Sequence, residues 1–208
     1  MDITSLFTDP EIITKIQTRL PELFHVAELE SSRAGKIGME VGSLREKILI
    51  ALLIYKFGKE NVETDIPITE PEVDVKLFGV PISIKTMTGK KPGGVKLKWT
   101  VDAEQALRFS LEYIPCFDTM LVHINWDGEG SLFYFPCSIQ REVLQNTGRG
   151  QFFSLPKPGT NPRGVEISSK AINLLAIHPQ SLRIPIEWHK KAVDYDPHKR
   201  WLEHWRRD

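Results

Sequence analysis

The chain has 208 residues, which is enough for one domain with a well-buried core. Hydrophobic residues make up 41% and charged residues 26% of it, as in ordinary globular proteins, which excludes a largely disordered or fibrous chain. Lys and Arg number 27, and so do Asp and Glu, so any attraction to nucleic acid has to come from a local patch of charge.

Cysteine content and hydropathy indicate where in the cell the protein is expected. Cys116 and Cys137 are too few for a disulfide framework, and we expect both to be small buried hydrophobic residues. The longest apolar run, at 48–54, is too short to span a membrane, and the first residues do not resemble a secretory signal. The expected location is the cytoplasm, without a membrane partner.

The first half of the chain predicts two helices and a hairpin. One helix begins at Asp9, is broken or restarts at Pro21, and ends near Glu30. A glycine-rich loop at 31–42 leads to a second helix from Ser43 to Gly58, which is apolar on nearly all sides. Alternating residues at 73–77 and 80–86 then predict a β-hairpin that turns at Phe78-Gly79.

The second half predicts a mixture of strands and helices. In chain order they are a strand at 95–100, a helix at 102–113, strands at 119–126 and 131–135, a helix capped by Ser138, a helix at 168–177, a strand at 182–188 and a helix at 196–207. The predicted fold class is therefore mixed α/β, with a central mixed sheet flanked by helices. We expect one domain, with possible accessory helices at 1–34 and 190–208.

The hairpin brings together two oppositely charged residues. A two-residue turn pairs Leu77 with Val80, and the alternation then places Asp74 and Lys85 on the face opposite the core, as diagonal neighbours. The alternative is a surface ion pair without a function, worth well under about 1 kcal/mol.

Charge is also segregated along the sequence around the hairpin. Six acids without an intervening base are followed by five lysines without an intervening acid: Glu60, Glu63, Asp65, Glu70, Glu72 and Asp74, then Lys85, Lys90, Lys91, Lys96 and Lys98. Carboxylates that can bind a hard cation thus lie beside lysines that can bind an anionic polymer. A solvated loop is the competing interpretation of the lysines.

Glu46 is a third candidate. It precedes Leu49 and Leu53 on the same side of the second helix, so its carboxylate is expected to face the interior, where it needs a partner. Two interpretations are open: Ser43 and Glu46 form a capping box, or Glu46 joins Asp74 at a metal site.

These residues resemble the motif of the PD-(D/E)xK nucleases, and specifically of the type II restriction endonucleases. The resemblance consists of a helix with Glu46, a strand with Asp74, and Ser83-Ile84-Lys85 in the next strand. Ser83 stands where the family normally has an acid, and Val73 where it has proline. The resemblance implies that Glu46 supplies the missing carboxylate.

The resemblance implies a restriction-endonuclease-like core and Mg²⁺-dependent, sequence-specific hydrolysis of double-stranded DNA. Glu46 and Asp74 would ligate the metal, and Lys85 would position the attacking water or stabilise charge on the phosphate. The products would carry a 5′-phosphate and a 3′-hydroxyl, with CGCG cut to blunt ends as the implied site. A palindromic site cut on both strands implies a homodimer.

Several residues are candidates for DNA binding. They are Met39, Ser83, Lys90, Lys91, Lys96, Lys98, Arg149 and Arg163. The lysines suit phosphate contacts, and Arg149 and Arg163, on predicted loops, suit contacts to guanine. Met39 precedes the helix of Glu46 and suits insertion between bases from the minor groove; packing in the core or in a dimer contact is the alternative.

Two other functions compete with restriction. One is a structure-specific nuclease of the same fold that acts in repair or on DNA junctions. The other is a DNA-binding module without catalytic activity, which Ser83 favours because it removes a usual metal ligand.

Overall fold

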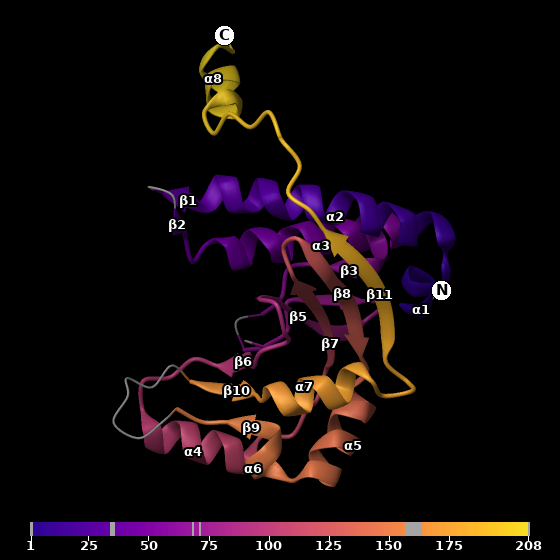
Figure 1. The fold of residues 1–208 in the computed structure, drawn as a ribbon, viewed down its shortest axis with the longest axis vertical. Coiled ribbons are helices and arrows are strands. Elements are labelled where there is room, and N and C mark those ends of the chain that lie inside the picture. The colour runs from indigo at the N-terminus through magenta and orange to yellow at the C-terminus, as the bar shows by residue number, and fades with distance from the viewer. Residues whose placement is uncertain (1, 34–35, 68, 71, 157–163, 208) are drawn as a thin grey trace.

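The computed structural model describes residues 2–33, 36–67, 69–70, 72–156 and 164–207 (Figure 1). Its main sheet has six strands in the order β11-β8-β7-β5-β4-β3. Their bounds are β3 Val62–Glu63, β4 Val75–Leu77, β5 Val80–Thr88, β7 Asp118–Ile124, β8 Gly128–Phe135 and β11 Leu182–Trp188. β5 and β7 are parallel and the other pairs antiparallel, so the predicted mixed sheet is confirmed.

Three helices cover one face of this sheet (Figure 1). They are α1 (Thr4–Thr8), α2 (Pro10–Ser31) and α3 (Val41–Phe57). Every fourth residue of α2 from Ile12 to Phe24, and of α3 from Leu49 to Phe57, is buried in the core. These buried residues pack the N-terminal helices onto the sheet. α2 runs unbroken through Pro21, which is itself buried.

A second layer covers the opposite face of the sheet. It contains α4 (Ala103–Glu112), α5 (Cys137–Thr147), α6 (Arg149–Phe152) and α7 (Ser169–Ala176). A three-stranded sheet, β6-β10-β9, joins this layer, with β6 at Val95–Lys98, β9 at Phe153–Ser154 and β10 at Val165–Ile167. Leu121, Phe133 and Phe135 of the main sheet form the second core together with these elements.

Some boundaries differ from those predicted. The expected loop before α3 contains two paired strands, β1 (Ser32–Arg33) and β2 (Lys36–Ile37). α3 begins at Val41, two residues before the predicted start, and α5 begins at Cys137, so Ser138 is not its cap. A 3₁₀ turn, η1, spans Lys59–Asn61. Cys116 is exposed, which contradicts its expected burial.

The C-terminal helix α8 (Lys199–Trp205) extends away from the body beyond α2 (Figure 1). It is shorter than the predicted helix at 196–207, because residues 197 and 198 form a turn before it and it ends at Trp205. Across the part of the chain that the structure describes, no helix combines the length and the apolarity needed to cross a membrane.

Candidate active site

The hairpin of β4 and β5 has the predicted register. Val75 pairs with Ile82 and Leu77 with Val80. Phe78 and Gly79 form the turn with φ angles of 51° and 77°, as a two-residue turn between twisted strands requires. This register confirms that Asp74 and Lys85 share a face.

Asp74 is held at this site by three contacts to one carboxylate oxygen. Its Oδ2 accepts a hydrogen bond from the backbone N–H of Ile84 at 2.5 Å and one from Ser83 Oγ at 3.3 Å. Lys85 Nζ lies 3.5 Å from the same oxygen. The backbone N–H and the buried hydroxyl fix the carboxylate, so the ion pair is part of an organised polar cluster and not a mobile surface contact.

Ser83 has a different role from the one expected. Its side chain is only 1% exposed, so it cannot touch DNA in this structure, and its hydroxyl is occupied by Asp74. The residue at the position of the family's usual acid therefore orients the neighbouring acid.

Glu46 lies near this pair. Burial raises the pKa of the Glu46 carboxyl, the negative charge of Asp74 raises it further, and the positive charges of Lys85 and Lys47 oppose the rise in pKa. Helix and hairpin thus bring Glu46, Asp74 and Lys85 within electrostatic reach of one another. The capping-box interpretation is wrong, because Glu40 occupies the N-cap position and Ser43 lies inside the helix.

The donor set fits a magnesium ion. Among the described residues, no group of three or more His, Cys, Asp and Glu side chains is placed to hold a metal. Glu46 and Asp74 are two carboxylates close enough for the charge of one to raise the pKa of the other. Mg²⁺ usually binds one or two carboxylates, keeps several waters and takes substrate phosphates as further ligands. The mutual repulsion of the two carboxylates is also what a divalent cation would relieve.

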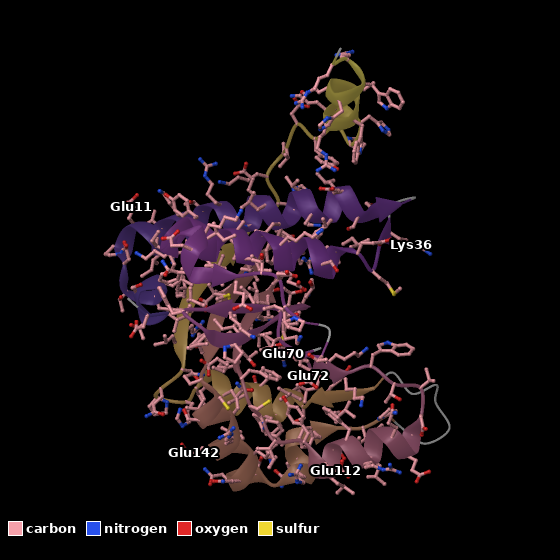
Figure 2. The ribbon with its side chains drawn as sticks, turned by 180° about the vertical axis from the view of Figure 1, so that it is seen from behind. Glu11, Lys36, Glu70, Glu72, Glu112 and Glu142 are labelled. Carbon is pink, nitrogen blue, oxygen red and sulfur yellow. The ribbon has the colours of Figure 1, made fainter. Side chains whose placement is uncertain are left out.

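Glu72 is a site residue that the sequence reasoning did not single out. Figure 2 places it near the centre of the molecule, between the two helical layers. Burial raises the pKa of its carboxyl, and a hydrogen bond with Tyr113 and the charges of Lys85 and Lys98 oppose the rise in pKa. The signal in the sequence was the acidic stretch that ends at Asp74, in which Glu72 is the acid nearest to Asp74.

The lysines beyond the hairpin lie in two settings. Lys90 and Lys91 are exposed in the loop after β5, whereas Lys96 and Lys98 are half-buried on β6. Lys98 Nζ lies 5.3 Å from the centre of the Phe109 ring, and the neighbouring Trp99 is 65% exposed. The chain thus carries four cationic side chains immediately after the strand that bears Lys85.

The structure bears differently on Met39, Arg149 and Arg163, the other residues predicted to bind DNA. The Met39 side chain is 97% exposed in the turn before α3, so it does not pack in the core of this chain. Arg149 begins α6 instead of lying on a loop, and its Nη1 donates to the carbonyls of Ser110 and Tyr113, each at 2.8 Å. This geometry favours a structural role for Arg149 over a base contact. Arg163 lies outside the described residues.

Comparison with known proteins identifies the family of the chain. The family model "Restriction endonuclease ThaI" matches residues 6–207. The chain belongs to the ThaI restriction endonuclease family. Its members are site-specific deoxyribonucleases, and the predicted enzyme class is confirmed.

A solved structure agrees with this family. The chain is 57% identical to a protein described as "Restriction endonuclease in complex with substrate DNA", with a TM-score of 0.91 and 98% of each chain covered. The search of curated proteins found no match. The restriction-endonuclease-like core predicted from the motif is thus confirmed, and DNA binding is supported by the family and by this structural relative.

Proposed function

We propose that this chain is a Mg²⁺-dependent type II restriction endonuclease with Glu46, Asp74 and Lys85 as its catalytic residues. The observation that carries the proposal is the convergence of two carboxylates and one ammonium from a helix and two adjoining strands. In the structural relative the bound molecule is substrate DNA, and double-stranded DNA is the substrate proposed for this chain.

Each side chain has a defined task in this chemistry. Glu46 and Asp74 would hold the ion, which when bound neutralises phosphate charge and lowers the pKa of a coordinated water. Asp74 can keep its orientation throughout because Ser83 and the backbone of Ile84 hold it. Lys85 has three donors, so while it contacts Asp74 it can still orient a water or stabilise the negative charge that grows on the phosphate oxygens.

The DNA contacts form the second part of the proposal. Lys90, Lys91, Lys96 and Lys98 would bind phosphates and set the register of the duplex. The exposed Met39 side chain would insert between base pairs from the minor groove, which suits an unbranched apolar side chain outside the core. Two copies related by a twofold axis would cut the two strands of a palindrome. We propose CGCG, cut to blunt ends with 5′-phosphates and 3′-hydroxyls, as the site and the cytoplasm as the location.

Plasmid cleavage with sequenced ends tests this function. The protein is incubated with plasmid DNA and Mg²⁺, and we expect discrete fragments that share CGCG-derived blunt termini. Cleavage at branched DNA alone would support a junction nuclease instead, and an intact plasmid would support a binding module. Discrete fragments with another shared terminal sequence would support a restriction endonuclease and refute CGCG as its recognition site.

Point variants test the catalytic residues. Asp74→Ala and Lys85→Ala should abolish cleavage and leave DNA binding in Ca²⁺ largely intact. Lys76→Ala is the matched control, because Lys76 lies on the same face of the hairpin but pairs with Glu70, at 3.0 Å. Cleavage retained in either test variant would refute its assignment.

A further inference from the structure

A buried ion pair lies behind the active site, and nothing in the catalytic scheme uses it. Glu28 of α2 and Arg45 of α3 are only 3% and 5% exposed, and Arg45 Nη2 lies 2.6 Å from Glu28 Oε1. Buried charges are costly unless they are fully paired, so a pair at this place needs an explanation.

Glu28 and Arg45 each contact further side chains besides one another. Glu28 Oε1 also accepts a hydrogen bond from Trp126 Nε1 at 2.8 Å, and Glu28 Oε2 lies 2.7 Å from Lys190 Nζ. The Arg45 guanidinium lies 5.5 Å from the centre of the Phe24 ring. Glu28 is thus held from three sides, which makes it a rigid anchor for Arg45.

Arg45 links this anchor to the two elements that carry the catalytic residues. It directly precedes Glu46 on α3, and its Nη1 donates to Thr88 Oγ1 at 3.2 Å. Thr88 is the last residue of β5, the strand that bears Lys85. The planar Arg45 side chain therefore joins the first turns of α3 to the end of β5, and Glu28 of α2 pairs with the same guanidinium.

We propose that Arg45 is a positioning residue that sets where Glu46 stands relative to Asp74 and Lys85. A guanidinium can bridge Glu28 and Thr88 at once because its donors are fixed in a plane, whereas the point charge of a lysine cannot reproduce that geometry. Partners behind metal ligands typically change metal affinity by about 10–100-fold. This inference rests on the proposed function, because it assumes that Glu46 and Asp74 hold a metal.

Two variants of graded severity test the role. Arg45→Lys keeps the charge and loses the planar bridge. Thr88→Val keeps the shape of an exposed residue and removes only the link to β5, so it preserves the buried pair and folding. Lys56→Met is the matched control, since Lys56 also joins α3 to α2, through Asp9 at 2.6 Å, but at the far end of α3.

The primary readout is metal binding followed without catalysis. The Ca²⁺ concentration that gives half of the maximal rise in melting temperature is measured for each protein. We expect it to increase by roughly tenfold in Arg45→Lys and by a smaller factor in Thr88→Val, and to stay at the wild-type value in Lys56→Met. The single-turnover cleavage rate at saturating DNA should fall in the same order, with DNA affinity unchanged within about twofold.

Two outcomes would overturn the inference separately from the function. If the wild-type protein cleaves DNA and binds Ca²⁺ while both variants match it in metal dependence, the positioning role is wrong and the function stands. If the wild-type protein neither cleaves DNA nor responds to the metal, the proposed function is wrong and the positioning role falls with it.

Discussion

Replacing Ser83 by aspartate should make the stability of the fold depend on a divalent cation. The substitution restores the acid that the family motif normally has at this position. It also places a second carboxylate next to Asp74, at a position that is 1% exposed. A matched Ser83→Asn variant has nearly the same shape without the charge.

The size of the effect follows from the observed distance. At the 3.3 Å that separates Ser83 Oγ from Asp74 Oδ2, two negative charges repel by about 5 kcal/mol at an effective dielectric constant of about 20. Lys85, 3.5 Å from the same Asp74 oxygen, offsets part of this. We expect a net loss of about 3 kcal/mol relative to Ser83→Asn, which lowers the melting temperature by roughly 6–12 °C in a chain of this size.

The assay is thermal unfolding at pH 8 in EDTA and in millimolar Mg²⁺. Ser83→Asp should unfold well below Ser83→Asn in EDTA and recover most of the difference with the metal, which binds only the folded site. The introduced carboxyl is expected to have a raised pKa in the folded state, so its penalty is complete above that pKa, shrinks as the pH falls below it and disappears only near the ordinary Asp pKa of about 4. Equal melting temperatures of the two variants in both buffers would refute the idea that this site gathers carboxylates around a cation.

Three further outcomes are expected. Glu46→Gln should lose cleavage but unfold in EDTA at the wild-type melting temperature or above it. The gain in melting temperature should be larger at pH 8 than at pH 5, because a carboxyl with a raised pKa costs stability only when it is charged. A clear loss of stability at pH 8 would contradict this. Gly164→Ala should destabilise the pairing of β10 with β6 by about 2–4 kcal/mol and weaken DNA binding at low salt. The reason is that Gly164 has a φ of 95° and an added Cβ would lie 1.9 Å from the Lys98 carbonyl oxygen. Wild-type stability of the variant would exclude this effect. Met39→Ala should weaken binding to a CGCG duplex more than to random DNA, and an equal loss on both would rule out insertion between bases.

The hairpin was predictable because its determinants are local. Alternation and a two-residue turn fixed the register, and with it the shared face of Asp74 and Lys85. The parallel pairing of β5 with β7 and the antiparallel pairing of β6 with β10 in a second sheet were not predictable, because these partners are distant in the sequence and no local pattern identifies them. For the same reason the sequence predicts a loop at Arg149, although backbone carbonyls at the end of α4 hold its side chain.

The ion pair of Glu28 and Arg45 could have been found from the sequence. Glu28 continues the four-residue spacing of Ile16, Leu20 and Phe24, and Arg45 begins the corresponding spacing of Leu49 and Leu53. A charge on each of two buried helical stripes predicts that the two charges meet. The local patterns at this point of the sequence involve the neighbouring Glu46 instead, through a capping pattern and a family motif.

The separate origins of the three proposed catalytic side chains bear on how the enzyme would become active during folding. Asp74 and Lys85 are joined by a tight turn, so this half of the site can form within one short segment early in folding. Glu46 arrives only when α3 docks on β5 over the first core. Under the proposed catalytic roles, a newly made or partly unfolded chain would therefore hold an incomplete site, and hydrolysis would begin only after α3 has docked on the sheet.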